Sequence, residues 1–523
     1  MTGFAALLRL FLARDKWMIL AWTAGITLLY WSQAISIEGV YQSQHEFDAA
    51  AALMEKNAAF IAMAGPPRAL NTVGGQVTWQ ASAFGAVCAG LMSMFLIGRH
   101  TRAEEESGRD ELLRSTALGR WAPQTAALVT ALIANAVVAL GVGGSLLGYG
   151  LPAQGSLASA LQVGLTGAVF AGTALVAAQL TQSTRGMYGI AGAILAVAYV
   201  LRAIGDVGNG VLSWLSPIGW GQAMHAYSGD DFGPALLLAA AAVLAVVASY
   251  LLFERRDVGS GLFAARPGPA RASAGLLRPW GLAWRLHRGS VLGWTIGLFL
   301  FGLAYGSIGD SAADLIGGSE VTKEILEVAG AALVDGFFAN ALLMLSLLAC
   351  GFAISSALRP RSEEEAGRVE GLLATALPRG HWFAAHGVVT VIGVFVIAVG
   401  SALGMAAGYA GATGDWDRLG PFLAGSLSLC AGTLVWVGFA RLLYALNARW
   451  APWAWLGLGF STVVMLFARP LRFPDWLSDL SPYTHLALVP AEEFAWRPVL
   501  VLLALVALLW WSAQAAFARR DVH

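Results

Sequence analysis

The chain has 523 residues, of which 57% are hydrophobic and only 12% are charged, and its formal net charge is zero. A mean hydropathy of +0.66 excludes an ordinary soluble domain and indicates an all-α polytopic membrane protein. A net charge of zero gives no indication of a basic surface for nucleic acid. No lysine follows a glycine, which excludes a phosphate-binding loop of the usual form. We therefore expect this chain to bind no ATP, metal or other cofactor itself.

The N-terminal segment 3–16 mixes apolar side chains with charged ones and predicts a short helix lying in the membrane interface. We expect the first membrane span to start near Trp17. Apolar runs long enough to cross a bilayer then recur along the whole chain. They predict about twelve spans, six in each half, at 17–37, 76–98, 125–149, 156–181, 187–204, 232–253, 290–309, 333–357, 383–411, 420–446, 450–468 and 498–518.

The two halves of the chain resemble each other in sequence. FERRDV at 253–258 returns as FARRDV at 517–522, each directly after the last span of a half. Because an even number of spans separates such matches, the repeat is parallel and not inverted. We predict a six-helix half at 1–258, a cytoplasmic linker rich in Gly, Pro, Ala and Arg at 259–280, and a second six-helix half at 281–523.

The closest match is a charged segment, RAEEESGRDELLRSTALGR at 102–120 and RSEEEAGRVEGLLATALPR at 361–379. We call these segments the paired motif. We expect the three glutamates to open a short helix, where the helix dipole favours negative charge, and Gly108 and Gly367 to permit either a tight bend or a close approach of the backbone. One copy would fit a solvated loop that only fixes orientation, whereas two copies favour docking of a cytoplasmic partner. The candidate docking residues are Glu104, Glu105, Glu106, Gly108, Arg109, Glu111, Glu363, Glu364, Glu365, Gly367, Arg368 and Glu370.

Basic residues predict the orientation in the membrane. If both termini, the linker and the paired motif are cytoplasmic, 24 of the 32 lysine and arginine residues lie on the inner side. The outer segments would then include 205–231 and 470–497, each with a Ser-Pro pair. They suit either short re-entrant helices or ordinary capped loops.

The paired motif, the amphipathic N-terminus and the twelve spans together resemble the ABC exporter permeases of the type V fold. The paired motif on one chain is most similar to actinobacterial permeases described as polyketide-antibiotic (tetronasin-type) exporters, which include mycobacterial multidrug-efflux permeases. This resemblance covers essentially the whole chain. It implies a separately encoded ABC ATPase, two copies per permease chain, that holds ATP and Mg²⁺ and docks on 102–120 and 361–379 as coupling helices. It also implies a location in the bacterial plasma membrane.

In permeases of this kind the second and eighth spans face each other across the transport pathway. The two spans align here without a gap, and their aromatic residues offer a surface to a bulky apolar molecule. The alternative for Gln80 and Asn340 is hydrogen bonding between helices, which is common in membrane bundles. The candidate pathway residues are Gln76, Trp79, Gln80, Phe84, Asp335, Phe337, Phe338 and Asn340.

We therefore expect a permease that exports apolar or amphipathic small molecules. A lipid or glycolipid flippase, a gradient-driven drug carrier and a non-transporting sensor or scaffold coupled to an ATPase remain as alternatives. Asp206, Asp335 and His386 are ionisable residues near predicted spans, and none lies clearly at mid-membrane, which disfavours a proton relay. His386 is expected to be a satisfied interfacial side chain.

Overall fold

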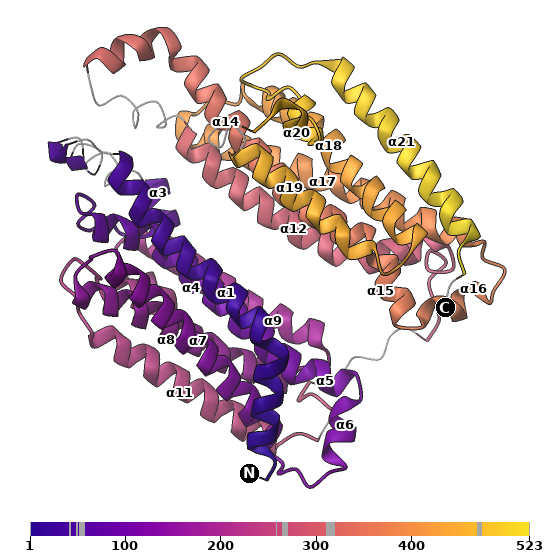
Figure 1. Cartoon of the computed structure of the whole chain (residues 1–523), viewed down its shortest axis with the longest axis horizontal. Helices are drawn as coiled ribbons and strands as arrows, with labels where there is room; N and C mark the ends of the chain where they lie inside the picture. The colour runs from indigo at the N-terminus through magenta and orange to yellow at the C-terminus, as the bar shows by residue number, and fades with distance from the viewer. Residues whose placement is uncertain are drawn as a thin grey trace. The chain divides into compact units, whose positions relative to one another are not determined.

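The protein folds into two compact units, Met1–Gly268 and Pro269–His523. Where the structure, a computed structural model, describes the chain, all regular secondary structure is helical, and each unit is a bundle of long helices (Figure 1). The all-α fold predicted from the composition is confirmed. The described residues are 2–40, 43–45, 47–48, 51, 58–257, 259–263, 270–309, 320–467 and 473–521.

The helices follow the predicted spans closely. The first unit contains α1 (Phe4–Val40), α3 (Ala58–Ala64), α4 (Val73–His100), α5 (Arg102–Glu106), α6 (Arg109–Arg114), α7 (Ala122–Gly148), α8 (Ala153–Leu180), α9 (Thr184–Val207), η1 (Leu212–Leu215), α10 (Pro217–Gln222) and α11 (Gly233–Glu254). The second contains α12 (Pro279–Gly309), α14 (Glu320–Ala357), α15 (Arg359–Glu365), α16 (Arg368–Leu373), α17 (Arg379–Thr413), α18 (Leu419–Leu446), η2 (Ala451–Trp453), α19 (Ala454–Phe467), α20 (Asp475–Ser478), η3 (Pro482–His485) and α21 (Trp496–Arg519).

Eleven helices in the described part of the chain are long and apolar enough to cross a membrane. The protein is therefore a multi-pass membrane protein. Within the described residues, the predicted span 450–468 corresponds to the 3₁₀ turn η2 followed by the 14 residues of α19.

The interfacial helix predicted for residues 3–16 is wrong as a separate element, because α1 runs without a break from Phe4 to Val40. Two of the charged residues that suggested a boundary near Trp17, Arg14 and Asp15, form ion pairs with residues of α4 and α5. Asp15 pairs with Arg99 at 3.0 Å and also contacts His100, two residues at the end of α4. A paired charge does not need the water that an interfacial boundary would supply.

Corresponding helices make the same pairings within each unit. In the first unit α8 packs against α4, α7 and α11, while α1 packs against α7 and α4. In the second unit α18 packs against α14, α17 and α21, while α12 packs against α17 and α14. Each half thus builds its own core from helices taken in the same order along the chain.

Four glycines bring α12 and α17 into backbone contact. A Cβ added at Gly404 would lie 2.0 Å from the carbonyl oxygen of Phe299, and one at Gly408 would lie 2.0 Å from that of Leu303. Gly302 and Gly306 face α17 just as closely. Glycines spaced four residues apart on both helices let the two backbones pack closely. In lipid, where the hydrophobic effect does not drive helices together, such van der Waals packing stabilises their association.

Gly404→Ala is expected to destabilise the protein by about 1–3 kcal/mol, because the new methyl group must push the two helices apart. The measurement is thermal unfolding of the purified protein. Gly411→Ala on the same helix is the matched control, since a Cβ there would meet no atom within 4 Å. Equal melting temperatures for the two variants would contradict this account of the packing.

Candidate functional site

The paired motif folds alike in both units. Each copy continues a long helix, α4 or α14, as a short helix that ends at the last of its three glutamates. Gly108 (φ +72°) and Gly367 (φ +66°) then turn the chain into a second short helix, α6 or α16. Left-handed φ values favour glycine, so the predicted bend is confirmed. In Figure 1 each pair of short helices lies at one end of its own unit.

The prediction that the three glutamates open a helix is confirmed in part for the first unit, where Glu104 and Glu105 lie in the first turn of the five-residue helix α5. It is wrong for the second unit, because the three glutamates there occupy the C-terminal end of α15, where the helix dipole disfavours negative charge. Arginines supplied by other segments compensate for this, and each glutamate of the motif has a different environment.

The first glutamate of each motif is buried against arginines of its own unit. Glu104 accepts a hydrogen bond from Arg14 of α1 at 2.5 Å, and Arg109 approaches it at 3.9 Å. Glu363 is bonded by Arg368 at 2.6 Å and by Arg359 at 3.1 Å. The hydrogen bond to Glu363 raises the pKa of Arg368, which keeps this guanidinium charged.

The second glutamate ties the motif to the end of the last span of the first unit. Arg256, just after α11, binds both carboxylate oxygens of Glu105, at 2.6 and 3.1 Å. Arg102 binds the same carboxylate at 2.8 Å, and Gln179 of α8 accepts from Arg256 Nε at 2.6 Å. The guanidinium of Arg256 also lies 5.2 Å from the ring centre of Phe253. Residues at the ends of three spans are therefore joined through the ion pair of Glu105 and Arg256.

The second unit repeats this arrangement. Arg520, which corresponds to Arg256 in the repeated Arg-Arg-Asp-Val stretch, forms an ion pair with Glu364. Tyr444 of α18 donates a further hydrogen bond to Glu364 at 2.6 Å. The ring of Phe517 lies 5.7 Å from the guanidinium of Arg520.

The remaining charges of the motif face outward. Glu106 accepts from the backbone N–H of Thr184 at 3.0 Å, and Glu365 pairs with Arg361 at 2.8 Å, both at the surface. Arg109 and Arg368 are largely exposed. Glu111 and Glu370 are exposed, and no described residue pairs with either carboxylate. Each motif is thus a buried anchor with an exposed charged end, a shape suited to passing a displacement from a partner into the spans.

The predicted pathway residues fall into different environments. Trp79 is buried, and its indole N–H donates to the carbonyl of Gly65 at 2.7 Å. Phe338 is fully buried, with the ring of Phe422 at 4.8 Å. Asp335 forms an ion pair with Arg418. Gln76 is buried, Gln80, Phe84 and Phe337 are half-buried, and Asn340 is exposed and donates to the carbonyl of Gly336 at 2.9 Å.

The side chain of His386 has a hydrogen-bonding partner, as the sequence analysis predicted for a satisfied histidine. Its Nδ1 lies 3.0 Å from Nε2 of His287, whose Nδ1 contacts Ser356 Oγ at 2.7 Å. The polar contacts of this histidine pair lie within the second unit.

Sequence reasoning missed the anchoring arginines, Arg14, Arg102, Arg256, Arg359 and Arg520, although one signal was available. The stretch Arg-Arg-Asp-Val occurs after the last span of each half, and the motif glutamates also occur once in each half. Two segments that are copied together are candidates for contact with each other.

Comparison with known proteins gives two findings. The family described as "Multidrug efflux system permease Rv1217c, C-terminal domain" matches residues 276–518. The multidrug efflux system permease protein Rv1217c of Mycobacterium tuberculosis is 39% identical over 530 residues, an alignment that covers 100% of this chain and 96% of the relative.

Proposed function

The chain belongs to the family of multidrug efflux permeases represented by Rv1217c, and we propose that it is the membrane subunit of an exporter powered by a separate ABC ATPase. In this proposal the cargo is an apolar or amphipathic drug or antibiotic, as in the tetronasin-type exporters. The protein would lie in the bacterial plasma membrane with both termini in the cytoplasm and would adopt the type V exporter fold.

Two copies of the ATPase would carry ATP and Mg²⁺ and dock on the exposed ends of the paired motif. The observation that carries this proposal is the anchor repeated in each unit, Glu105 with Arg256 and Glu364 with Arg520. Because the anchor joins the motif to the end of the last span, a displacement of the short helices would move several spans together. Such a movement would switch the permease between inward-open and outward-open states, while the permease itself would hydrolyse nothing.

A gradient-driven carrier is the second candidate, since the buried pair of His287 and His386 is the kind of group that proton-coupled carriers use. The charge on Asp335, by contrast, is already balanced by Arg418. The two candidates differ in where their driving energy comes from.

Efflux of ethidium from cells separates these possibilities. We expect extrusion when the permease is produced with an ABC ATPase encoded beside it, and none with an ATPase that cannot hydrolyse ATP. Extrusion by the permease alone that an ionophore abolishes would reject ATP coupling in favour of the carrier. Stimulated ATPase activity with no movement of ethidium or of fluorescent lipid would favour a sensor instead.

A further inference from the structure

The first unit contains a cavity of about 470 Å³ at the end of α4 opposite the motif helices. It is open to the surface and is lined by the turn before α4, the first turns of α4, the end of α9, η1, and α10 with the loop that follows it. Since α4 has 28 residues, roughly 40 Å of helix separate this cavity from α5. The cavity therefore lies far from α5 and α6, the short helices of the paired motif in this unit.

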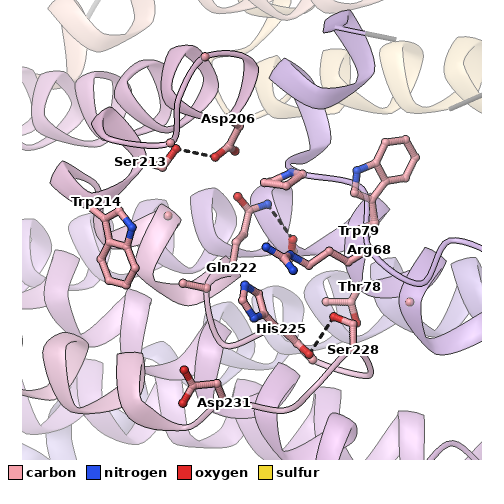
Figure 2. Close-up of a pocket in the computed structure, with 18 of the residues that line it drawn as sticks. Arg68, Thr78, Trp79, Asp206, Ser213, Trp214, Gln222, His225, Ser228 and Asp231 are labelled. Carbon is pink, nitrogen blue, oxygen red and sulfur yellow. Dashed lines mark hydrogen bonds between the residues drawn. The ribbon is translucent and has the colours of Figure 1, made fainter. Parts of the chain in front are cut away.

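Charged and polar side chains gather in this cavity. Figure 2 shows Arg68, Gln222 and His225 near its centre, with Asp206 and Asp231 to either side. A cavity with an equal number of acidic and basic groups has no obvious preference for either charge. The preference is set by which of these groups already have partners.

Both carboxylates are already engaged. Asp206 accepts a hydrogen bond from Ser213 at 2.5 Å and pairs with the buried Arg202 at 3.4 Å. Asp231 accepts from the backbone N–H of Gly233, the first residue of α11, at 2.8 Å. A cation entering the cavity would have to compete with these bonds.

Arg68 differs from the two carboxylates, because no described residue forms an ion pair or side-chain hydrogen bond with it. Burial and the charge of Arg68 lower the pKa of the neighbouring His225, although Asp231 acts in the opposite direction. The imidazole is therefore neutral at pH 7, with one ring N–H available to donate. The cavity thus presents one guanidinium, that of the exposed Arg68, to which no described residue is bonded, while Asp231 keeps its negative charge at the cavity edge.

The backbone around the cavity is strained. Within the described residues, the non-glycine residues with positive φ are Ala69 (47°), His225 (50°), Tyr227 (61°) and Asp230 (49°). All four lie in the turn before α4 or in the loop after α10. The hydrogen bond between Tyr227 and Ser156, 2.8 Å long, helps to hold that loop. Such conformations cost about 1–3 kcal/mol each and cluster where a binding group must be presented.

We propose that this cavity binds the anionic group of a small organic molecule, with Arg68 as its counter-ion. A guanidinium binds a carboxylate or a phosphate through two parallel hydrogen bonds, and His225 would supply a further donor. The indole of Trp214, which is 54% exposed at the cavity, provides a flat wall for the organic part of the ligand. The site is independent of how export is powered.

Binding is tested with the full-length protein in nanodiscs of neutral lipid. The probes are benzoate, benzylammonium and benzyl alcohol, which have similar ring systems and different charges, observed by saturation-transfer NMR. We expect benzoate to bind, and the other two probes to bind at least tenfold more weakly. Arg68→Gln is expected to weaken benzoate binding at least tenfold, and Arg68→Lys to weaken it less. Equal binding of all three probes, no binding of any, or an Arg68→Gln variant that binds benzoate normally would overturn the proposal.

Arg255→Gln is the matched control, because this exposed arginine lies at the other end of the first unit, after α11. Its benzoate affinity should equal that of the unmodified protein, and an equal loss in both variants would contradict a local site. Adding phosphatidylglycerol to the nanodiscs then identifies the source of the anion. A phosphatidylglycerol-dependent fall in benzoate binding that Arg68→Gln removes supports a lipid headgroup as the ligand, and unchanged binding supports a soluble organic anion.

Discussion

Glu105→Ala is expected to lower the free energy of unfolding by about 3–5 kcal/mol, the largest stability change we predict for a single residue. The substitution leaves two almost fully buried guanidinium groups, those of Arg102 and Arg256, without their shared carboxylate. Removing one partner of a buried ion pair costs much more than the pair contributes, because the remaining charge stays desolvated. Thermal and denaturant unfolding of the purified protein measures this loss.

Glu106→Ala is the control for this experiment, since it removes the next carboxylate along the chain, which is exposed. A surface change of this kind should cost less than about 1 kcal/mol. If Glu105→Ala were no more destabilising than Glu106→Ala, the anchor would have no structural role. Glu364→Ala should behave like Glu105→Ala, because Arg520 would lose its carboxylate in the same way.

Much of the fold could be predicted from the sequence because lipid imposes simple rules on a chain. Every backbone group in a bilayer needs a partner within its own segment, so apolar runs about twenty residues long must be helices. The run at 187–204, which contains Arg202 near its end, became the helix α9. Its arginine is buried and donates to the carbonyl of Met63 at 3.1 Å. A charge inside a predicted span thus signalled a tertiary contact and did not end the helix.

The failures have a common physical cause. The boundary near Trp17 and the position of the three glutamates of the second unit were both inferred from local preferences for charge. In the fold these charges meet partners far along the chain, as Arg14 of α1 meets Glu104 at 2.5 Å. Such a contact gives more stabilisation than the dipole term of about 0.3–1 kcal/mol that the local argument used. Local patterns locate the segments, whereas long-range pairs decide how their charged ends are arranged.

The buried anchor also changes which residues should contact a partner. Glu105 and Glu364 are largely enclosed by their own units, so the docking energy should come from the exposed end of the motif. Glu111 and Glu370 occupy equivalent positions there, and no described residue neutralises them. In the proposed complex, this exposed carboxylate, repeated in both motifs, would pair with a basic residue on each of the two ATPase copies.

The double variant Glu111→Lys/Glu370→Lys is therefore expected to weaken binding of the partner ATPase by about 2–5 kcal/mol, because it places like charges together at both contacts. At about 1.4 kcal/mol per tenfold change, this is roughly a thirty-fold to several-thousand-fold loss of affinity. Titration of the ATPase onto the permease in nanodiscs measures it. The melting temperature of the permease alone should not change, since both side chains are exposed.

Glu254→Lys/Asp521→Lys is the matched control, because it makes the same change of charge at two exposed residues outside the motif, the last residue of α11 and a residue just after α21. Equal losses from the two double variants would mean that the ATPase responds only to the overall charge of this end of the protein. Full affinity in Glu111→Lys/Glu370→Lys would reject docking at the second short helices, α6 and α16. Loss of affinity confined to the motif variant, with an unchanged melting temperature, would support the proposal that one surface binds the ATPase and that the buried ion pairs, a separate set of residues, transmit its movement.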